Sequence, residues 1–246
     1  LTEPFRQHDK KFLKILNEIR SNNMSEESLE LLEDRAQQSV KGKTTKLYTH
    51  NTDVDAINSA ELEKIDEEPR YYLMNSSGLD VLVDALKKHC LTSENLVLKK
   101  GAMVMFVKNN FEKGYVNGTL GKIIDFDAED FPIVKTHDGK TIKAKHVTWA
   151  IEEDDETKAQ ISQIPLRLAW AITVHKSQGM SLDAAEIDLS KSFVPGMGYV
   201  ALSRVKSLKG IQLLGANAMS LSVDPAIIRL DKKLRQASEE VEEELG

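Results

Sequence analysis

The sequence predicts an α/β domain with a parallel sheet, interrupted by a small antiparallel β-barrel. Near both ends of the chain, apolar residues at helical spacing alternate with short apolar runs typical of buried strands. Between residues 95 and 152, short β-branched runs follow one another with turn signals and without a helical pattern. The 246 residues are 41% apolar, which is enough for a substantial core. We therefore expect residues 1–94 and 153–246 to form one discontinuous domain, with residues 95–152 inserted as the barrel.

The N-terminal segment is expected to begin with two helices. A stripe at the i, i+3, i+4, i+7 spacing of a helix follows Asp9, and it consists of Phe12, Ile15, Leu16 and Ile19. Ser25, followed by two glutamates, has the composition of a second helix start. A short strand over residues 46–49 and a helix from Asp53 come next, which is the alternation of a parallel α/β sheet.

Turn signals divide the central segment into strands. Gly101, Asn117-Gly118 and Asp138-Gly139 lie between the apolar runs, and Asn-Gly and Asp-Gly favour tight turns because both residues tolerate positive φ. We expect strands at residues 96–98, 102–107, 121–126, 133–136, 141–144 and 147–151. The acidic run 152–156 is interpreted as the linker that leaves the barrel.

The C-terminal segment returns to the α/β pattern. Gly179 is the expected stop of a helix over residues 169–177. The remaining elements are strands at 164–168, 185–189 and 211–214, a helix at 198–205, and a last helix from Asp224 that ends in the acidic run 239–244.

Composition excludes several classes of protein. The single cysteine, Cys90, rules out an internal disulfide and fits a reducing compartment, and one Cys with six scattered His argues against a zinc site. No apolar run has the length of a membrane span and no secretory signal opens the chain, so we expect a cytoplasmic, nucleoid or nuclear location and no membrane partner. The net charge is −6, yet residues 161–215 carry six bases against three acids, and residues 96–125 carry five lysines against two acids. Local positive potential of this kind suits a groove for nucleic acid.

Two glycine motifs do not form nucleotide sites. Gly42-Lys43-Thr44 matches the end of a phosphate loop, but Gln37 stands where the loop needs its first glycine. Gly196-x-Gly198 lacks the third glycine of a dinucleotide fingerprint, because residue 201 is Ala. The sequence therefore contains no phosphate loop.

Two clusters carry the candidate chemistry. The first runs from Thr173 to Gly179, where hydroxyl, imidazole and amide groups suit contacts to nucleic-acid phosphates. It has no accompanying Ser-His-Asp or metal-ligand pattern, so we reject hydrolase and metalloenzyme interpretations. The second contains Tyr199, Ser203 and Arg204, and apolar neighbours make Arg204 a cation that needs a partner. That partner is either a carboxylate such as Asp183 or Asp188, or the γ-phosphate of a nucleotide.

In their context, these clusters resemble a known family. HKSQG at 175–179 and YVALSRV at 199–205 are similar to motifs V and VI of superfamily 1B DNA helicases, the branch of the RecD, Dda and Pif-type enzymes. FRQHDKKF at 5–12 and Thr49-His50-Asn51 resemble two further motifs, and 101–123 resembles the Src-homology-3-like barrel of the same enzymes. The resemblance implies a second RecA-like motor domain with that barrel inserted. It also implies ATP-dependent movement 5′ to 3′ along single-stranded DNA, with roles in DNA repair and recombination.

The resemblance also assigns residues. Arg204 and Arg6 are expected to reach the γ-phosphate as catalytic groups, and Gln178 with Gly179 to face ATP. The expected DNA contacts are Thr49, His50, Asn51, Thr173, His175, Lys176, Ser177, Lys108, Asn109 and Asn117. Phe111 and Tyr115 are either base-stacking residues or core of the barrel.

ATP and Mg²⁺ are expected to bind mainly to another RecA-like domain, which would carry the phosphate loop. The expected partners are therefore that domain and single-stranded DNA, with the protein acting as a monomer, and this chain alone should not hydrolyse ATP appreciably. The alternative is a helicase-derived module that binds nucleic acid or a partner without motor activity. A docking barrel on an inert α/β scaffold would explain neither cluster.

Overall fold

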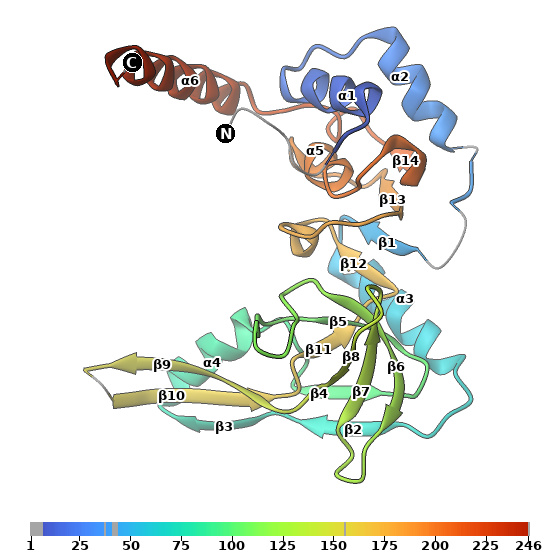
Figure 1. Ribbon diagram of the computed structural model, residues 1–246, viewed down its shortest axis with the longest axis vertical. Coiled ribbons are helices and arrows are strands. Elements are labelled where there is room, and N and C mark those ends of the chain that lie inside the picture. Colours follow the sequence, from blue (N-terminus) through green and yellow to red (C-terminus); the bar gives the residue numbers. More distant parts are fainter. Residues whose placement is uncertain (1–6, 37, 41–43, 155, 246) are drawn as a thin grey trace. The chain divides into compact units, whose positions relative to one another are not determined.

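The computed structural model describes residues 7–36, 38–40, 44–154 and 156–245, with side chains as far as Val241 (Figure 1). It contains two compact units. Unit 1 comprises Leu1–Val54 and Ile172–Gly246, and unit 2 comprises Asp55–Ala171.

Unit 1 is built on a four-stranded sheet in the order β12, β1, β13, β14 (Figure 1). Its strands are β1 (Thr45–Tyr48), β12 (Ala171–Thr173), β13 (Ala185–Leu189) and β14 (Ile211–Ala216). Strand β13 is parallel to both β1 and β14, and its Ile187 lies opposite Leu47 on one side and Leu213 on the other. These three side chains are buried, as is typical of a parallel sheet. Parallel pairing brings the carboxyl ends of β1 and β13 to the same edge.

Helices and short turns complete unit 1. They are α1 (Lys10–Arg20), α2 (Glu26–Glu33), η1 (Asp34–Ala36), the start of α3 (Asn51–Glu63), η2 (His175–Ser177), α5 (Met197–Leu202), η3 (Leu208–Gly210) and α6 (Pro225–Leu245). The stripe predicted for α1 is confirmed: Phe12, Ile15, Leu16 and Ile19 are all buried, and α1 packs against α5. The Arg35 guanidinium donates through Nε to the carbonyl of Ile211 at 2.7 Å, which fastens η1 to the edge strand β14.

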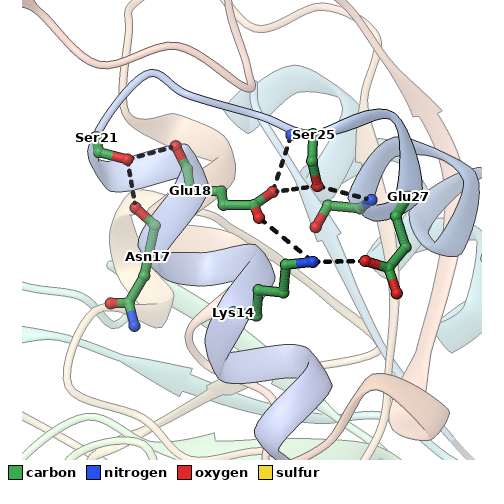
Figure 2. A network of polar contacts seen from close by, with 7 residues as sticks. Lys14, Asn17, Glu18, Ser21, Ser25 and Glu27 are labelled. Atoms are coloured by element: carbon green, nitrogen blue, oxygen red, sulfur yellow. Dashed lines mark hydrogen bonds and ion pairs between the residues drawn. The ribbon is translucent and has the colours of Figure 1, made fainter.

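A polar network fixes the turn between α1 and α2 (Figure 2). Lys14 Nζ lies 2.5 Å from a Glu27 oxygen and 3.8 Å from Glu18, so one cation links the two helices. Glu18 accepts from the Ser25 backbone N–H at 2.9 Å and from its hydroxyl at 2.8 Å, while that hydroxyl oxygen caps α2 by accepting from Ser28 N–H. The Ser25 hydrogen bond is the main reason that the pKa of Glu18 is lowered. Because the ion pairs are exposed, the network contributes more to geometry than to stability.

The barrel of unit 2 is a five-stranded antiparallel sheet in the order β11, β5, β6, β7, β8. Its strands are β5 (Met103–Phe106), β6 (Leu120–Phe126), β7 (Pro132–Thr136), β8 (Thr141–Lys143) and β11 (Leu166–Leu168). Its core includes the fully buried Phe106, Ile123, Val134 and Leu166. The turn predicted at Gly139 is confirmed, since β7 pairs with β8 and Gly139 has φ +89.

Unit 2 also contains elements outside the barrel. They are β2 (Arg70–Leu73) paired with β4 (Asn95–Leu98), the sheet β3 (Asn75–Gly78), β10 (Glu156–Gln163) and β9 (Val147–Glu153), and helix α4 (Asp80–His89) (Figure 1). The fully buried Gln163 joins these parts, because its amide nitrogen donates to the carbonyl oxygens of Tyr72 at 3.0 Å and Ser93 at 3.1 Å.

Two local predictions are wrong, and the inserted unit is longer than expected. Residues 169–177 do not form a helix: β12 lies beside β1, and Val174 N–H donates to Tyr48 O at 2.8 Å. Buried pairing in the sheet overrides the local helical pattern there. The acidic run 152–156 is no linker but the end of a hairpin, in which Glu153 pairs with Glu156. Unit 2 spans Asp55–Ala171 and not residues 95–152, because β3 pairs with β10, and α4 packs on that sheet.

Candidate nucleic-acid and nucleotide interface

The motif residues of unit 1 follow the carboxyl ends of neighbouring strands. Thr49 and His50 come directly after β1, η2 comes after β12, and Lys191 to Phe193 come after β13. The hydroxyl of Thr49 lies 3.3 Å from the carbonyl oxygen of Lys191, so the segments after β1 and β13 touch. In open α/β sheets this edge is where ligands bind.

Three rings meet at this edge. The centroid of the Phe193 ring lies 5.1 Å from that of His50 and 6.1 Å from that of His175. Phe193 nevertheless remains 52% exposed. The Asn217 amide donates to the carbonyls of Ser190 at 3.1 Å and Ser192 at 2.9 Å, which holds the segment before Phe193 in place. We call His50, Phe193 and His175 the ring cluster.

Contacts behind the ring cluster orient His50. The Thr49 hydroxyl lies 2.8 Å from His50 Nδ1 and 3.3 Å from Lys191 O. It therefore links the His50 ring to the segment that follows β13. Lys191 Nζ lies 3.1 Å from a carboxylate oxygen of Asp53, near the start of α3. Asn51, the first residue of α3, is exposed.

The turn at η2 divides the predicted contact residues into two groups. Thr173 and Ser177 are buried, and their hydroxyls serve the turn: Thr173 Oγ1 accepts from Lys176 N–H at 3.4 Å and Ser177 Oγ donates to Val174 O at 2.6 Å. By contrast, His175, Gln178 and Gly179 are exposed. Gly179 has φ +86, a conformation that favours glycine. Thr173 and Ser177 therefore shape the turn that presents the exposed group.

Arg204 lies just after α5. Its neighbours Ala201, Leu202 and Val205 are fully buried, as predicted, whereas Arg204 is half-buried. Its Nε donates to Val200 O at 2.9 Å and its Nη2 to Ser203 Oγ at 2.8 Å, which orients the guanidinium along the helix end. The carboxylates proposed as alternative partners have other contacts: Asp183 pairs with Lys206 at 2.6 Å, and Asp188 accepts from Ser190.

Gln7 is a residue that the sequence interpretation missed. Its buried amide donates to the carbonyls of Ser203 at 2.7 Å and Val205 at 3.1 Å, on either side of Arg204. Arg6 itself lies outside the described residues. Gln7 therefore fixes the described start of the chain to the segment on either side of Arg204. The available signal was the polar amide directly beside Arg6.

The candidate residues of unit 2 lie in one loop between β5 and β6. Lys108 Nζ donates to Thr148 O and stands over the Trp149 ring, 5.0 Å from its centroid. Asn109 Oδ1 accepts from Asn117 N–H at 2.8 Å, which closes the loop, and both asparagines are exposed. Of the two aromatic candidates, Tyr115 is core and stacks on Phe106 at 4.0 Å, whereas Phe111 is 78% exposed.

Two other site types are absent from the described part of the chain. There, no three His, Cys, Asp or Glu side chains are grouped as they would be around a metal ion. No helix among the described residues is both long enough and apolar enough to span a membrane.

The fold and the motif positions define a class of protein: an α/β domain with an inserted β-domain, of the kind found in DNA helicases. Residues 82–126, inside unit 2, match the family described as "DNA helicase Pif1, 2B domain". The ATP-dependent DNA helicase Pif1 of a Psychrobacter species is 40% identical over 93% of this chain and 43% of its own length.

Solved structures agree. Unliganded Pif1 from a Bacteroides species superposes with a TM-score of 0.80 at 31% identity, covering 95% of this chain and 56% of that one. Bacteroides Pif1 in complex with ADP-AlF3 and single-stranded DNA superposes with a TM-score of 0.70 at 31% identity, covering 96% of this chain and 56% of that one. Over nearly its whole length the chain is similar to Pif1 helicases, and it spans about half the length of these relatives.

Proposed function

We propose that this chain is the second motor domain of an ATP-dependent DNA helicase, holding single-stranded DNA while it supplies an arginine to bound ATP. The observation that carries the proposal is the ring cluster, exposed where neighbouring strands end. Exposed aromatic faces stack on bases whatever the sequence, as a translocating motor requires. The Bacteroides Pif1 structure that contains both ADP-AlF3 and single-stranded DNA supports the proposal, because this chain shares its fold.

The proposed DNA contacts fall into two sets. In unit 1, His50 and Asn51 act with His175 and Lys176. The buried Thr49 orients His50, while Thr173 and Ser177 hold the turn in shape. Phe193 is added to this set because its exposed ring joins the two histidines. In unit 2, the set is Lys108, Asn109 and Asn117. Contacts from side-chain amides, hydroxyls and cations to phosphates position a strand without reading its bases.

The proposed nucleotide contacts are Arg204 and Arg6 at the γ-phosphate, with Gln178 and Gly179 beside them. Transfer of the γ-phosphoryl group develops charge on its oxygens, and an arginine delivered from a second domain stabilises that charge. The hydrogen bonds of Arg204 to Val200 O and Ser203 Oγ orient its guanidinium for delivery when two motor domains close. With no phosphate loop in this sequence, ATP phosphates and Mg²⁺ are assigned mainly to the other motor domain.

The setting of this activity is also a proposal. We assign translocation 5′ to 3′, one chain per motor, and an intracellular location in cytoplasm, nucleoid or nucleus, with roles in DNA repair and recombination. The free thiol of Cys90 supports a reducing compartment. The rival function is a binding module without motor activity, which would need the ring cluster but not the arginines.

DNA titration of a Phe193→Ala variant tests the proposal. Fluorescence anisotropy of a short labelled single strand would measure Kd at low salt for wild type, Phe193→Ala and Val194→Ala. Loss of one stacked base costs about 1–3 kcal/mol, so the Kd of Phe193→Ala should rise roughly 5- to 150-fold. Val194 is the matched control, since it is the adjacent exposed apolar residue and has no ring contact among those described.

The two variants separate the possible results. Equal affinity of Phe193→Ala and wild type would remove the ring cluster from the DNA path and with it the observation on which the proposal rests. Equal losses in both variants would assign the effect to the local loop and not to stacking.

A further inference from the structure

Helix α6 (Pro225–Leu245) carries an apolar stripe that no described residue covers. Its exposed fractions are high: 56% for Ile227, 51% for Leu230, 61% for Leu234 and 53% for Val241. With Ala237, which is also exposed, these residues are spaced by three, four, three and four positions. Such spacing is the a and d seam of a coiled coil, and it is narrower than the face that a helix buries on a globular core.

The attachment of α6 to unit 1 uses another face of the helix. Arg20 at the end of α1 lies 2.5 Å from Asp231, and it is the first cause of the lowered pKa of that carboxyl. Just before the helix, Val223 and the Asn22 amide exchange two hydrogen bonds, at 2.6 and 2.7 Å. These contacts fasten the start of α6 and leave the stripe facing outwards. The helix in Figure 1 accordingly extends beyond α1.

The charges flanking the stripe are divided along the helix. Residues 229–235 contain four bases and one acid, whereas residues 239–244 contain five glutamates. Two copies of α6 side by side in parallel would place like charges together. In antiparallel order, the basic half of each copy faces the acidic half of the other, which is attractive.

One antiparallel register satisfies the charged positions and four of the five apolar positions, and it leaves Ile227 opposite residue 244 at the end of the seam. When Leu230 faces Val241 of a second copy, Leu234 faces its Ala237, and the small alanine allows the helices to approach closely. In that register Lys233 of each copy stands beside Glu240 of the other, on the flank of the seam. Two symmetric ion pairs then border four apolar layers, as in a two-fold interface.

We propose that two copies of this chain associate through an antiparallel coiled coil of their α6 helices. This surface is independent of the function proposed above, and it replaces the expectation of a monomer with two motors held side by side. Each motor still works with its own residues, because α6 contributes none of the proposed DNA or ATP contacts.

Sedimentation equilibrium of the 246-residue chain tests the pairing. The mass average should rise from 27.6 kDa towards about twice that value with increasing concentration, because the stripe buries only when a second copy is present. Leu234→Glu should remain at 27.6 kDa, since it places a carboxylate in the seam. Lys232→Gln makes the same change of net charge at an exposed position on the opposite face of the helix and should associate like wild type. Circular dichroism of each variant reports whether the helix is retained.

A charge exchange tests the orientation. Lys233→Glu and Glu240→Lys should each associate more weakly than wild type, because each sets like charges against one another across the seam. An equimolar mixture of the two variants should regain association, since opposite charges then face each other at both positions. A wild-type mass that stays at 27.6 kDa at all concentrations overturns the proposal. So does association that Leu234→Glu leaves unchanged, or a mixture no stronger than its components.

Discussion

The two units present their candidate contacts in different ways. In unit 1, the ring cluster and Arg204 follow strands or a helix, and buried side chains fix each of them: Thr49 behind His50, and Gln7 around Arg204. In unit 2, Lys108, Asn109 and Asn117 lie in one long loop that closes on itself. The position of the candidate contacts in unit 1 therefore depends on the fold of its sheet, whereas in unit 2 it depends mainly on the conformation of one loop.

This difference predicts two kinds of sensitivity. Changes in unit 1 should alter a specific step, either stacking or hydrolysis, because each residue there has a fixed partner. Changes in unit 2 should alter affinity gradually and with a marked dependence on salt, because its lysines contribute charge.

The largest expected effect is that of Arg204→Ala on ATP turnover. In a protein that joins this chain to a phosphate-loop motor domain, loss of an arginine finger should reduce turnover by about 10³–10⁵. The Kd for single-stranded DNA should change little. Lys206→Ala is the matched control, because Lys206 is a nearby cation that is exposed and pairs with Asp183. Steady-state ATP hydrolysis with Mg²⁺ and DNA would measure the turnover of both variants. Equal turnover in Arg204→Ala and Lys206→Ala would favour the binding module without motor activity.

A pair of glycine substitutions compares the units directly. Gly179 in unit 1 and Gly139 in unit 2 have φ of +86 and +89, and each has open space where a side chain would stand. Gly179→Ala and Gly139→Ala should therefore cost similar free energies of unfolding, about 1–2 kcal/mol, from the strained backbone alone. Hydrogen exchange within each unit would measure this.

Only Gly179→Ala should also weaken DNA binding, because it distorts the turn that presents His175. Loss of affinity in both glycine variants would show that DNA binding does not depend specifically on the turn at η2.

The sequence was most informative where side-chain pattern and backbone agree. The strands expected between residues 96 and 151 and the α1 stripe follow from periodicity and from glycine turns, and their positions in the chain are confirmed. Two of these strands, β4 and β9, nevertheless pair outside the barrel sheet. The helix over residues 169–177 was wrong because its strand pairing is set by β1, more than 120 residues earlier, and not by local propensity. In the acidic run 152–156 the charge pattern concealed a hairpin, since exposed edge strands tolerate charged residues.

The candidate site shows the same limit. Arg204 and the residues of η2 were found because they form contiguous motifs. Phe193 was missed because an isolated phenylalanine after a strand has no special pattern until β1 and β12 bring two histidines to its ring. Gln7 was missed because its partners, the carbonyls beside Arg204, are almost 200 residues away.

A smaller effect is expected from Lys108→Ala in unit 2. If Lys108 neutralises one phosphate, its loss should weaken DNA binding a few-fold and reduce the slope of log K against log salt by about 1. Lys113→Ala, in the same loop, removes an equal charge from an exposed position and is the control. Anisotropy titrations over a range of salt would measure both slopes. A salt slope that stays at the wild-type value in Lys108→Ala would take this lysine out of the DNA path.

The smallest effect concerns acid sensitivity of unit 2. The Lys143 ammonium, followed by the backbone N–H groups of Phe131 and Glu129, holds the pKa of Asp127 below its usual range. A lowered folded-state pKa stabilises the fold above the unfolded-state pKa, and this stabilisation is lost as pH falls through the folded-state value. Asp127→Asn should therefore be less stable than wild type at neutral pH. The melting temperature of Asp127→Asn should also fall less than that of wild type when the pH is lowered from neutral to strongly acidic.

Asp125→Asn serves as the comparison, because it removes the same charge from a side chain that is 62% exposed and pairs with Lys100 at 3.4 Å. Thermal melts over the acid range would measure the three proteins, and the gap between wild type and Asp127→Asn should close as the carboxylate becomes protonated. A gap that is constant with pH would assign the role of Asp127 to its neutral hydrogen bonds. In that case the loop 127–131 of unit 2 would be held by uncharged side-chain hydrogen bonds, as the hydroxyls of Thr173 and Ser177 hold the turn at η2 in unit 1.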